Sequence, residues 1–176
     1  MLEELVVLRL GHRPQRDKRI TTHLALCARA LGASGMVYSG ERDSKLEEGV
    51  RDVVERWGGS FWVRYTASWR RELREWGGRV VHLTMYGVPV QEAVGEIRAW
   101  GGPLLVVVGG PKVPGEVYHL AHWNASVTNQ PHSEVSALAL FLYLLQGEEA
   151  LTHTFPGAKI EIEPTPRGKK VKTGKL

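Results

Sequence analysis

Five consecutive apolar residues, Leu104 to Val108, constrain the fold of this 176-residue chain more than any other feature. A strand with one face in water alternates polar and apolar residues, whereas this run (LLVVV) has no polar position. Such a strand is covered on both faces, as in a parallel sheet packed between helices. The run ends at a double glycine, Gly109-Gly110. The segment therefore predicts a buried strand of an α/β protein that ends in a loop.

Predicted strands and helices alternate along the rest of the chain, and a polar loop at 11–18 follows the first strand. The apolar patterns predict strands at 5–10, 36–39, 61–65, 80–84, 104–108 and 123–127. They predict helices at 20–31, 44–57, 69–76 and 90–100, and another that opens at Ser133. This alternation predicts a parallel, doubly wound α/β sheet with helices on both faces.

The helix that opens at Ser133 has almost no polar face, because the run from Ala137 to Leu145 is apolar throughout. Such a helix is buried on all sides. In a small protein this predicts a subunit interface as well as a core position, and hence a homodimer. Ser133 itself suits an N-cap, with Glu134 in the first turn favoured by the helix dipole.

The apolar helical pattern ends at Gly147, and shorter alternating segments follow it. We therefore divide the chain into a main domain at 1–147 and an extension at 148–176. Residues 159–163 and 169–172 alternate on either side of a turn rich in proline and glycine. That pattern predicts a short β-hairpin followed by a basic tail.

Composition excludes several classes of protein. Hydrophobic residues make up 43% of the chain, which is enough for a packed core. No apolar run approaches the roughly 20 residues that span a bilayer, and no signal peptide is evident, so we expect a cytoplasmic protein. The single cysteine, Cys27, cannot form an intrachain disulfide.

The net charge is +4, and the basic residues cluster near the two ends of the chain. Such clusters favour a phosphate-rich partner, although a solvated surface explains them as well. The first cluster contains Arg9, His12, Arg13, Arg16, Lys18, Arg19 and His23, and the second contains Arg167, Lys169, Lys170, Lys172 and Lys175.

Three loops, at 84–87, 109–114 and 127–133, are predicted at one edge of the sheet, where α/β proteins bind ligands. They are rich in backbone donors and carry few charges, which suits a neutral or zwitterionic ligand with an adenine ring. Neither a G-x-x-x-x-G-K-[ST] loop nor a G-x-G-x-x-G fingerprint is present, which disfavours nucleotide triphosphatases and nicotinamide dehydrogenases. A tight turn explains the glycines at 109–115 equally well.

Two further kinds of chemistry lack a complete set of residues. His119, His122 and His132 have no cysteine or carboxylate at a spacing that completes a metal site, so we predict no metal. Ser133 follows His132 but has no G-x-S-x-G context, which argues against a nucleophile.

Five segments together resemble the SPOUT class of methyltransferases, and most closely the archaeal tRNA ribose 2′-O-methyltransferases that modify cytidine 56 in the TΨC loop. The segments are LRLGHRP at 8–14, RDKRITTH at 16–23, HLTMYG at 82–87, VGGPKVP at 108–114 and NQPHSEVSALA at 129–139. The resemblance implies a C-terminal trefoil knot, a homodimer packed through the knot, tRNA as substrate and S-adenosylmethionine as cofactor.

The resemblance also implies the cofactor-binding residues, which all belong to the three loops or to the start of the following helix. They are Leu83, Thr84, Gly87, Gly109, Gly110, Lys112, Val113, Pro114, Val127, Asn129, Gln130, His132, Ser133 and Glu134.

The catalytic group departs from the pattern of related ribose methyltransferases. Those enzymes carry an arginine six residues before the glycine that ends the first long helix, and the corresponding residue here is Leu26. The role then falls to Arg9, Arg13, Arg19 or His23, and of these we expect Arg19, His23 and Arg13 to be catalytic. His23 is the candidate base, because imidazole accepts protons near neutral pH, while the arginines suit phosphate binding and polarisation of the hydroxyl.

RNA contacts are expected from Arg9, Arg13, Arg16, Lys18 and Arg19. Two alternatives remain open. One is a methyltransferase of the same class that acts on another tRNA or rRNA nucleotide, and the other is a non-catalytic RNA-binding module.

Overall fold

The computed structural model describes residues 4–17, 19–110 and 112–174. Its main body is a six-stranded sheet in the order β3-β2-β1-β5-β4-β6, and every neighbouring pair is parallel. The strands are β1 (Leu5–His12), β2 (Gly35–Gly40), β3 (Trp62–Tyr65), β4 (Arg79–Pro89), β5 (Leu104–Gly109) and β6 (Trp123–Ser126). The predicted parallel sheet is confirmed.

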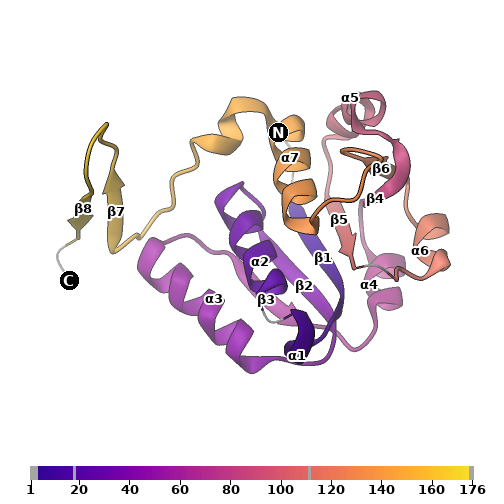
Figure 1. Cartoon of the computed structure of the whole chain (residues 1–176), viewed down its shortest axis with the longest axis horizontal. Helices are drawn as coiled ribbons and strands as arrows, with labels where there is room; N and C mark the ends of the chain where they lie inside the picture. The colour runs from indigo at the N-terminus through magenta and orange to yellow at the C-terminus, as the bar shows by residue number, and fades with distance from the viewer. Residues whose placement is uncertain (1–3, 18, 111, 175–176) are drawn as a thin grey trace.

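Helices cover both faces of the sheet, as the sequence predicted (Figure 1). One face packs against α2 (Ile20–Ala30), α3 (Ser44–Trp57), α5 (Val90–Trp100) and α7 (Glu134–Gln146). The other packs against α4 (Trp69–Glu75) and α6 (Gly115–Leu120). Strand β5 lies between β1 and β4, and its residues Leu104 to Val108 are at most 1% exposed. The apolar run was therefore interpreted correctly.

The predicted loop at 11–18 is wrong in part. Strand β1 continues to His12, and a short helix α1 (Pro14–Asp17) follows. Gly11 has φ +69, and the pairing of β1 with β2 is irregular between Arg9 and His12. A single left-handed glycine thus lets the strand bend and continue.

The fourth strand is also longer than predicted. Strand β4 runs to Pro89 instead of ending near Thr84, because it pairs with β6 a second time after an irregularity between Leu83 and Val88. The segment 84–87 is therefore an extended bulge within a strand. Polar and glycine residues predicted a loop here, whereas the partner strand β6 keeps the backbone extended.

Helix α7 is capped by Ser133, whose hydroxyl accepts from the backbone N–H of Val135 at 3.2 Å. It lies beside α2 and α5. Complete burial of this helix was predicted, but in the single chain Leu140 and Tyr143 remain 44% and 37% exposed. One stripe of α7 is thus available to a further partner.

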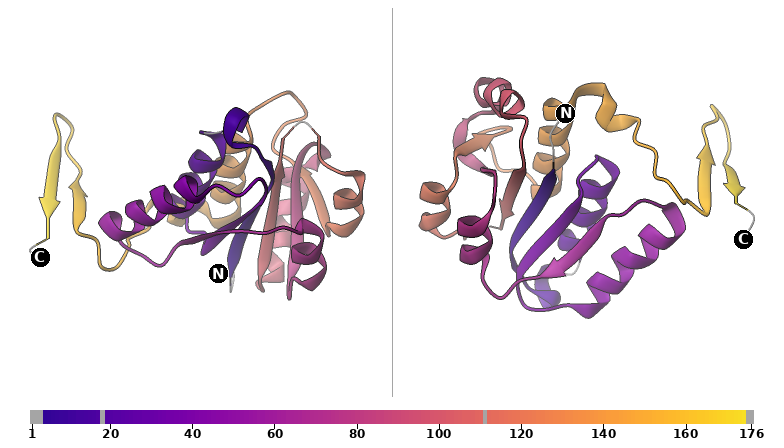
Figure 2. Two further views of the ribbon diagram at one scale, coloured as in Figure 1. Left: turned by 90° about the horizontal axis from the view of Figure 1, so that it is seen from below. Right: turned by 180° about the vertical axis from the view of Figure 1, so that it is seen from behind.

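The C-terminal extension begins with the short helix η1 (Gly147–Leu151) and ends in the predicted hairpin, β7 (Ile160–Glu163) and β8 (Lys170–Thr173). Figure 2 shows the hairpin standing away from the main body. The connecting segment is tied to the end of α3, where Gly59 N–H donates to Pro156 O at 2.8 Å and the Arg29 guanidinium lies 4.1 Å from the Phe155 ring centre. None of the described helices has the length and apolar character needed to cross a membrane.

Candidate functional site

A cleft of about 490 Å³ opens at the carboxyl edge of the sheet, between the ends of β4 and β5 and the start of α7. Seven of the predicted cofactor residues line it, namely Leu83, Thr84, Gly109, Gly110, Val113, His132 and Glu134. Its wall also contains residues that the sequence did not predict, namely His82, Met85, Tyr86, Val108, Tyr118, Pro131 and Ala137. Parallel strands bring these distant segments together, since all their carboxyl ends meet at one edge.

The bulge of β4 and the loop before α7 are held together across the cleft. The Asn129 side-chain amide donates to Met85 O at 2.7 Å and to Gly87 O at 3.2 Å. His132 Nδ1 lies 2.6 Å from Gln130 O, which fixes the next part of the same loop. Asn129 therefore holds two walls of the cleft together, although its own side chain does not line the cleft.

Close packing explains two of the predicted cofactor glycines. A side chain at Gly109 would meet Val113 Cγ2 at 2.4 Å, and one at Gly87 would meet Asn124 O at 2.5 Å. Neither glycine has a left-handed backbone, so close packing, and not backbone strain, requires the missing side chain.

A buried polar network lies beneath the cleft. His82 is fully buried, its Nδ1 lies 2.9 Å from Asn124 Oδ1, and its ring meets Tyr118 edge-on at 4.7 Å between centres. Because the Asn124 amide nitrogen donates to Tyr118 O, its oxygen accepts from His82 Nδ1, which leaves Nε2 as an acceptor. Burial lowers the pKa of His82, and the Asn124 hydrogen bond opposes this only in part. This network was not predicted from the sequence, although a histidine among the apolar residues at 80–83 could have indicated it.

Other predicted cofactor residues lie near the cleft but do not line it within the described part of the chain. Lys112, Pro114 and Gln130 are exposed, and Val127 packs partly against the core. Ser133 serves as the cap of α7. The cleft therefore draws mainly on β4, β5 and the first turn of α7.

The predicted RNA-contacting residues divide into two groups. Arg13, Arg16 and Arg19 are exposed around α1 and the start of α2, as is the catalytic candidate His23. Arg9 differs, because it is only 2% exposed and its Nη1 lies 3.7 Å from Glu134 Oε1. Lys18 lies outside the described residues.

Buried His12 fastens this basic segment to the body of the protein. Its Nδ1 lies 2.7 Å from Thr21 Oγ1 and its Nε2 lies 3.2 Å from Asp43 Oδ2. Asp43 in turn accepts from Leu46 N–H and so caps α3. His12 therefore joins β1, α2 and α3 and was wrongly grouped with the surface cations.

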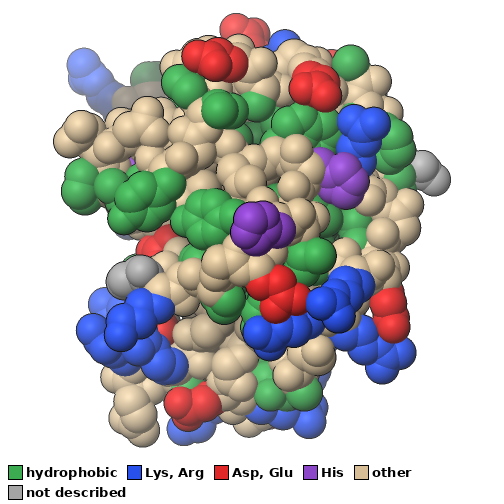
Figure 3. Space-filling view, turned by 90° about the vertical axis from the view of Figure 1, so that its right-hand side faces the viewer, with side chains coloured by type: hydrophobic (Ala, Val, Ile, Leu, Met, Phe, Trp, Pro, Cys, Tyr) green, Lys and Arg blue, Asp and Glu red, His purple; other side chains and the backbone are tan. Residues whose placement is uncertain are grey.

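The arginines of α4 carry less free charge than their number suggests. Figure 3 shows Lys and Arg side chains gathered in the lower part of the face that α4 and α6 form. Arg70 and Arg74 both pair with Glu116, at 2.6 and 2.8 Å. Arg16 and Arg19, by contrast, have no ion-pair partner among the described residues.

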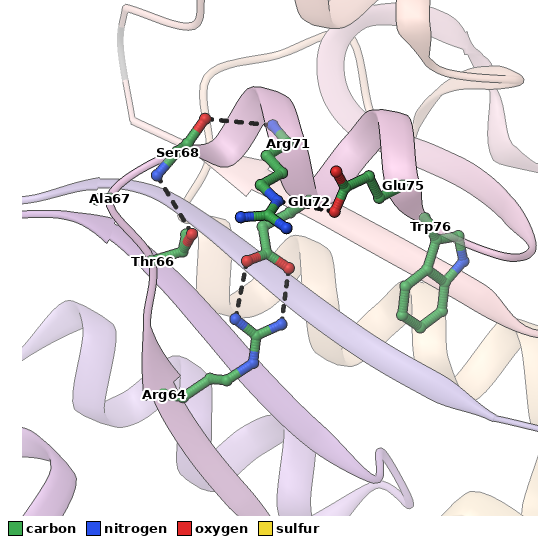
Figure 4. A pocket seen from close by; sticks show the side chains of 8 residues that line it. All are labelled: Arg64, Thr66, Ala67, Ser68, Arg71, Glu72, Glu75 and Trp76. Carbon is green, nitrogen blue, oxygen red and sulfur yellow. Dashed lines mark hydrogen bonds and ion pairs between the residues drawn. The ribbon is translucent and has the colours of Figure 1, made fainter.

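A second hollow, of about 540 Å³, lies between β3 and α4 (Figure 4). Its charges satisfy one another, since Arg64 and Glu72 form two hydrogen bonds of 2.8 and 2.7 Å and Arg71 donates to Glu75 at 2.8 Å. Because these charged side chains already pair with one another, we do not expect a charged ligand to bind in this hollow.

Among the described residues, no group of three or more His, Cys, Asp or Glu side chains is placed to hold a metal ion. His122 Nδ1 instead accepts from Val80 N–H at 3.0 Å.

The parallel sheet has a cleft at its carboxyl edge, and at the same edge Arg16 and Arg19 lack an ion-pair partner within the described ranges. This arrangement is that of an α/β enzyme suited to a polyanionic substrate. Solved structures of RNA-modifying enzymes share this fold. The TrmH/SpoU tRNA modifying enzyme of A. aeolicus matches with a TM-score of 0.61 at 14% identity, over 85% of this chain and 78% of that one. The SpoU methyltransferase AviRb of Streptomyces viridochromogenes, solved with AdoMet, matches with a TM-score of 0.56 at 17% identity, over 82% and 57%.

Sequence comparison is more specific. A family model described as tRNA ribose 2′-O-methyltransferase, aTrm56, matches residues 57–172. The tRNA (cytidine(56)-2′-O)-methyltransferase of Methanothermobacter thermautotrophicus is 54% identical over 94% of both chains. That of Pyrococcus horikoshii is 51% identical over 95% of this chain and 84% of its own. The chain belongs to this family of tRNA ribose 2′-O-methyltransferases.

Proposed function

We propose that this enzyme transfers the methyl group of S-adenosylmethionine to the ribose 2′-hydroxyl of cytidine 56 in tRNA. The observation that carries the proposal is the position of the cleft, which opens at the same sheet edge as the exposed side chains of Arg13, Arg16 and Arg19. The relatives named for this reaction support the choice of nucleotide.

The residues of the cleft fit an adenosyl ligand. Its volume lies within the usual range for small-molecule sites, and its wall combines apolar side chains with backbone groups and a few polar atoms. Gly110 lets the backbone approach a flat ring, and His82 Nε2 offers a buried acceptor that no described residue uses. When bound, the sulfonium supplies an electrophilic methyl group.

The protein's part in the reaction is largely to position the ribose. The hydroxyl oxygen must lie about 3–3.5 Å from the methyl carbon and in line with the breaking bond. Arg13 and Arg19 bind the phosphates that flank the ribose, and one of them polarises the hydroxyl. His23, exposed on α2, accepts the proton as the oxygen attacks.

We also propose a homodimer, a trefoil knot formed by the segment that ends in α7, and a metal-free reaction in the cytoplasm, where tRNA is modified. The exposed Leu140 and Tyr143 on an otherwise apolar helix support the dimer. The passage of the chain from β6 to α7, which packs between α2 and α5, supports the knot.

The proposal is tested with unmodified tRNA transcripts and radiolabelled S-adenosylmethionine. We expect one methyl group per tRNA, and none when the nucleotide at position 56 is 2′-deoxycytidine. Labelling of the deoxy transcript at the same rate would contradict the site. Methylation at another nucleotide would point to a different target, and binding of tRNA without any methylation would indicate an RNA-binding module.

A further inference from the structure

Arg9 is a buried cation that the roles described so far leave unexplained. Arg9 lies two residues after Val7 in β1 and therefore on the same face of the sheet, which α2 and α7 cover. Its side chain is 3% exposed. Among the described residues its Nε and Nη1 atoms have no hydrogen-bond acceptor. Unsatisfied buried donors are rare and costly, and those of a guanidinium are especially so.

The nearest opposite charge, Glu134, does not satisfy these donors. Glu134 Oε1 lies 3.7 Å from Arg9 Nη1, which allows attraction but exceeds the length of a hydrogen bond. Glu134 is 25% exposed in its side chain and lines the cleft. The pair therefore presents a carboxylate at the cleft wall with a guanidinium immediately behind it.

Gly110 leaves the space between the cleft and this guanidinium open. A Cβ atom at Gly110 would stand 3.7 Å from Glu134 Oε1 and 3.8 and 3.9 Å from the two terminal nitrogens of Arg9. Gly110 also lines the cleft. The absence of a side chain there therefore gives a small ligand inside the cleft access to Arg9.

An RNA phosphate does not suit this position. The guanidinium lies behind the cleft wall, whereas a phosphodiester belongs to a polymer that stays at the surface. The Glu134 carboxylate would also repel it. The ligand that fits has a short arm with both signs of charge, an anionic group for Arg9 and a cationic group for Glu134.

We infer that Arg9 and Glu134 form an α-amino-acid subsite, which holds the methionine end of S-adenosylmethionine by its carboxylate and its ammonium group. The inference rests on the proposed function, since it names the residues that bind one end of the S-adenosylmethionine proposed to occupy the cleft. The ligand carboxylate supplies the acceptor that Arg9 lacks, and Glu134 accepts from the ammonium group. Burial lowers the pKa of Arg9, and a bound carboxylate would offset that desolvation as Glu134 does in part.

Two ligands that differ only at this end provide the test. S-adenosylhomocysteine carries the α-amino acid, whereas 5′-methylthioadenosine has the same adenosine and sulfur but lacks it. Calorimetry measures both with the wild-type protein, Arg9→Met and Glu134→Gln. We expect each variant to lose about tenfold or more in affinity for S-adenosylhomocysteine and less than about twofold for 5′-methylthioadenosine.

Three controls accompany the measurement. Arg16→Met makes the same chemical change in the basic segment and should alter neither affinity. Gly110→Ala, whose added methyl meets only ordinary contacts, should also weaken S-adenosylhomocysteine selectively. Thermal unfolding shows whether each variant is folded. If Arg9→Met does not fold, the affinities of Glu134→Gln for the two ligands test the inference.

An equal loss for both ligands would show that the pair only supports the cleft, and unchanged affinities would show that it does not touch the ligand. Either result overturns the inference. If the salt dependence of tRNA binding falls in Arg9→Met as in Arg16→Met, Arg9 contacts RNA and the inference is also overturned. Failure of the wild-type protein to bind either ligand would overturn the proposed function itself.

Discussion

The side chain of Asn129 bridges the cleft by donating to two carbonyl oxygens, those of Met85 at 2.7 Å and Gly87 at 3.2 Å. Asn129 lies 44 residues after Met85 and 42 residues after Gly87 in the sequence. The bulge of β4 and the loop before α7 therefore take up their positions together.

Replacement of Asn129 by alanine should lower the affinity for S-adenosylmethionine about tenfold, since two hydrogen bonds, each with a net value of about 0.5–1.5 kcal/mol, no longer hold the bulge of β4 against the loop before α7. Calorimetry measures this change. Gln130→Ala is the matched control, because Gln130 is exposed and does not line the cleft. Equal affinities in the two variants would contradict the bridging role.

Local sequence patterns were sufficient for most of the fold. The bounds of α3 and α5 match their predictions, because each helix has an apolar stripe and a glycine at its end. The run from Leu104 to Val108 predicted a strand covered on both faces without any knowledge of its neighbours. In these elements, local preference and tertiary packing agree.

The errors arose where tertiary contacts override local preference. Strand β4 continues past Thr84 because β6 pairs with it again at Val88, and no local pattern reveals that partner. Arg9 and His12 resembled surface cations because basic residues surround them in the sequence. Their burial depends on α7 and α3, which supply Glu134 and Asp43 from distant parts of the chain.

The pKa of His82 predicts a dependence of stability on pH. Burial lowers this pKa below its ordinary value of 6.5, so the unfolded chain binds a proton at higher pH than the folded chain does. The free energy of unfolding should therefore fall as the pH decreases below about 6.5, until it reaches the folded pKa. In His82→Gln, denaturant titrations across this range should give a smaller fall. If the free energy of unfolding fell with pH as steeply in His82→Gln as in the wild type, His82 would not be a buried neutral imidazole. His122→Gln is the control, because burial also lowers the pKa of His122 and its share of the pH dependence must be measured separately.

The basic segment should make tRNA binding depend on salt. Arg16 is exposed and has no ion-pair partner among the residues described, so its charge is free to contact a phosphate. Arg16→Ala should reduce the slope of log affinity against log salt by about 1. Fluorescence anisotropy with labelled tRNA measures the slope. Arg71→Ala is the control, because Arg71 already pairs with Glu75 at 2.8 Å and should change the slope less.

Arg19→Ala should lower methylation of tRNA while leaving the affinity for S-adenosylmethionine nearly unchanged. Arg19 is exposed next to α2 and outside the cleft wall, so its loss affects the ribose and phosphate without altering the cofactor site. Single-turnover methylation and calorimetry separate the two effects. Full turnover with normal tRNA affinity would show that the basic segment is only a solvated surface.

The exposed stripe of α7 should mediate the homodimer. Leu140 and Tyr143 are 44% and 37% exposed, while Leu142 between them is fully buried in the single chain. A charge at Leu142 would therefore disrupt the fold, whereas a charge at Leu140 tests association alone. Leu140→Glu should shift the protein to a monomer in light scattering at low micromolar concentration, because an unpaired carboxylate is costly inside an apolar interface. Leu151→Glu places the same charge on a leucine that is 67% exposed in η1 and should leave the dimer intact. A wild-type monomer, or a Leu140→Glu dimer as stable as the wild type, would contradict this interface.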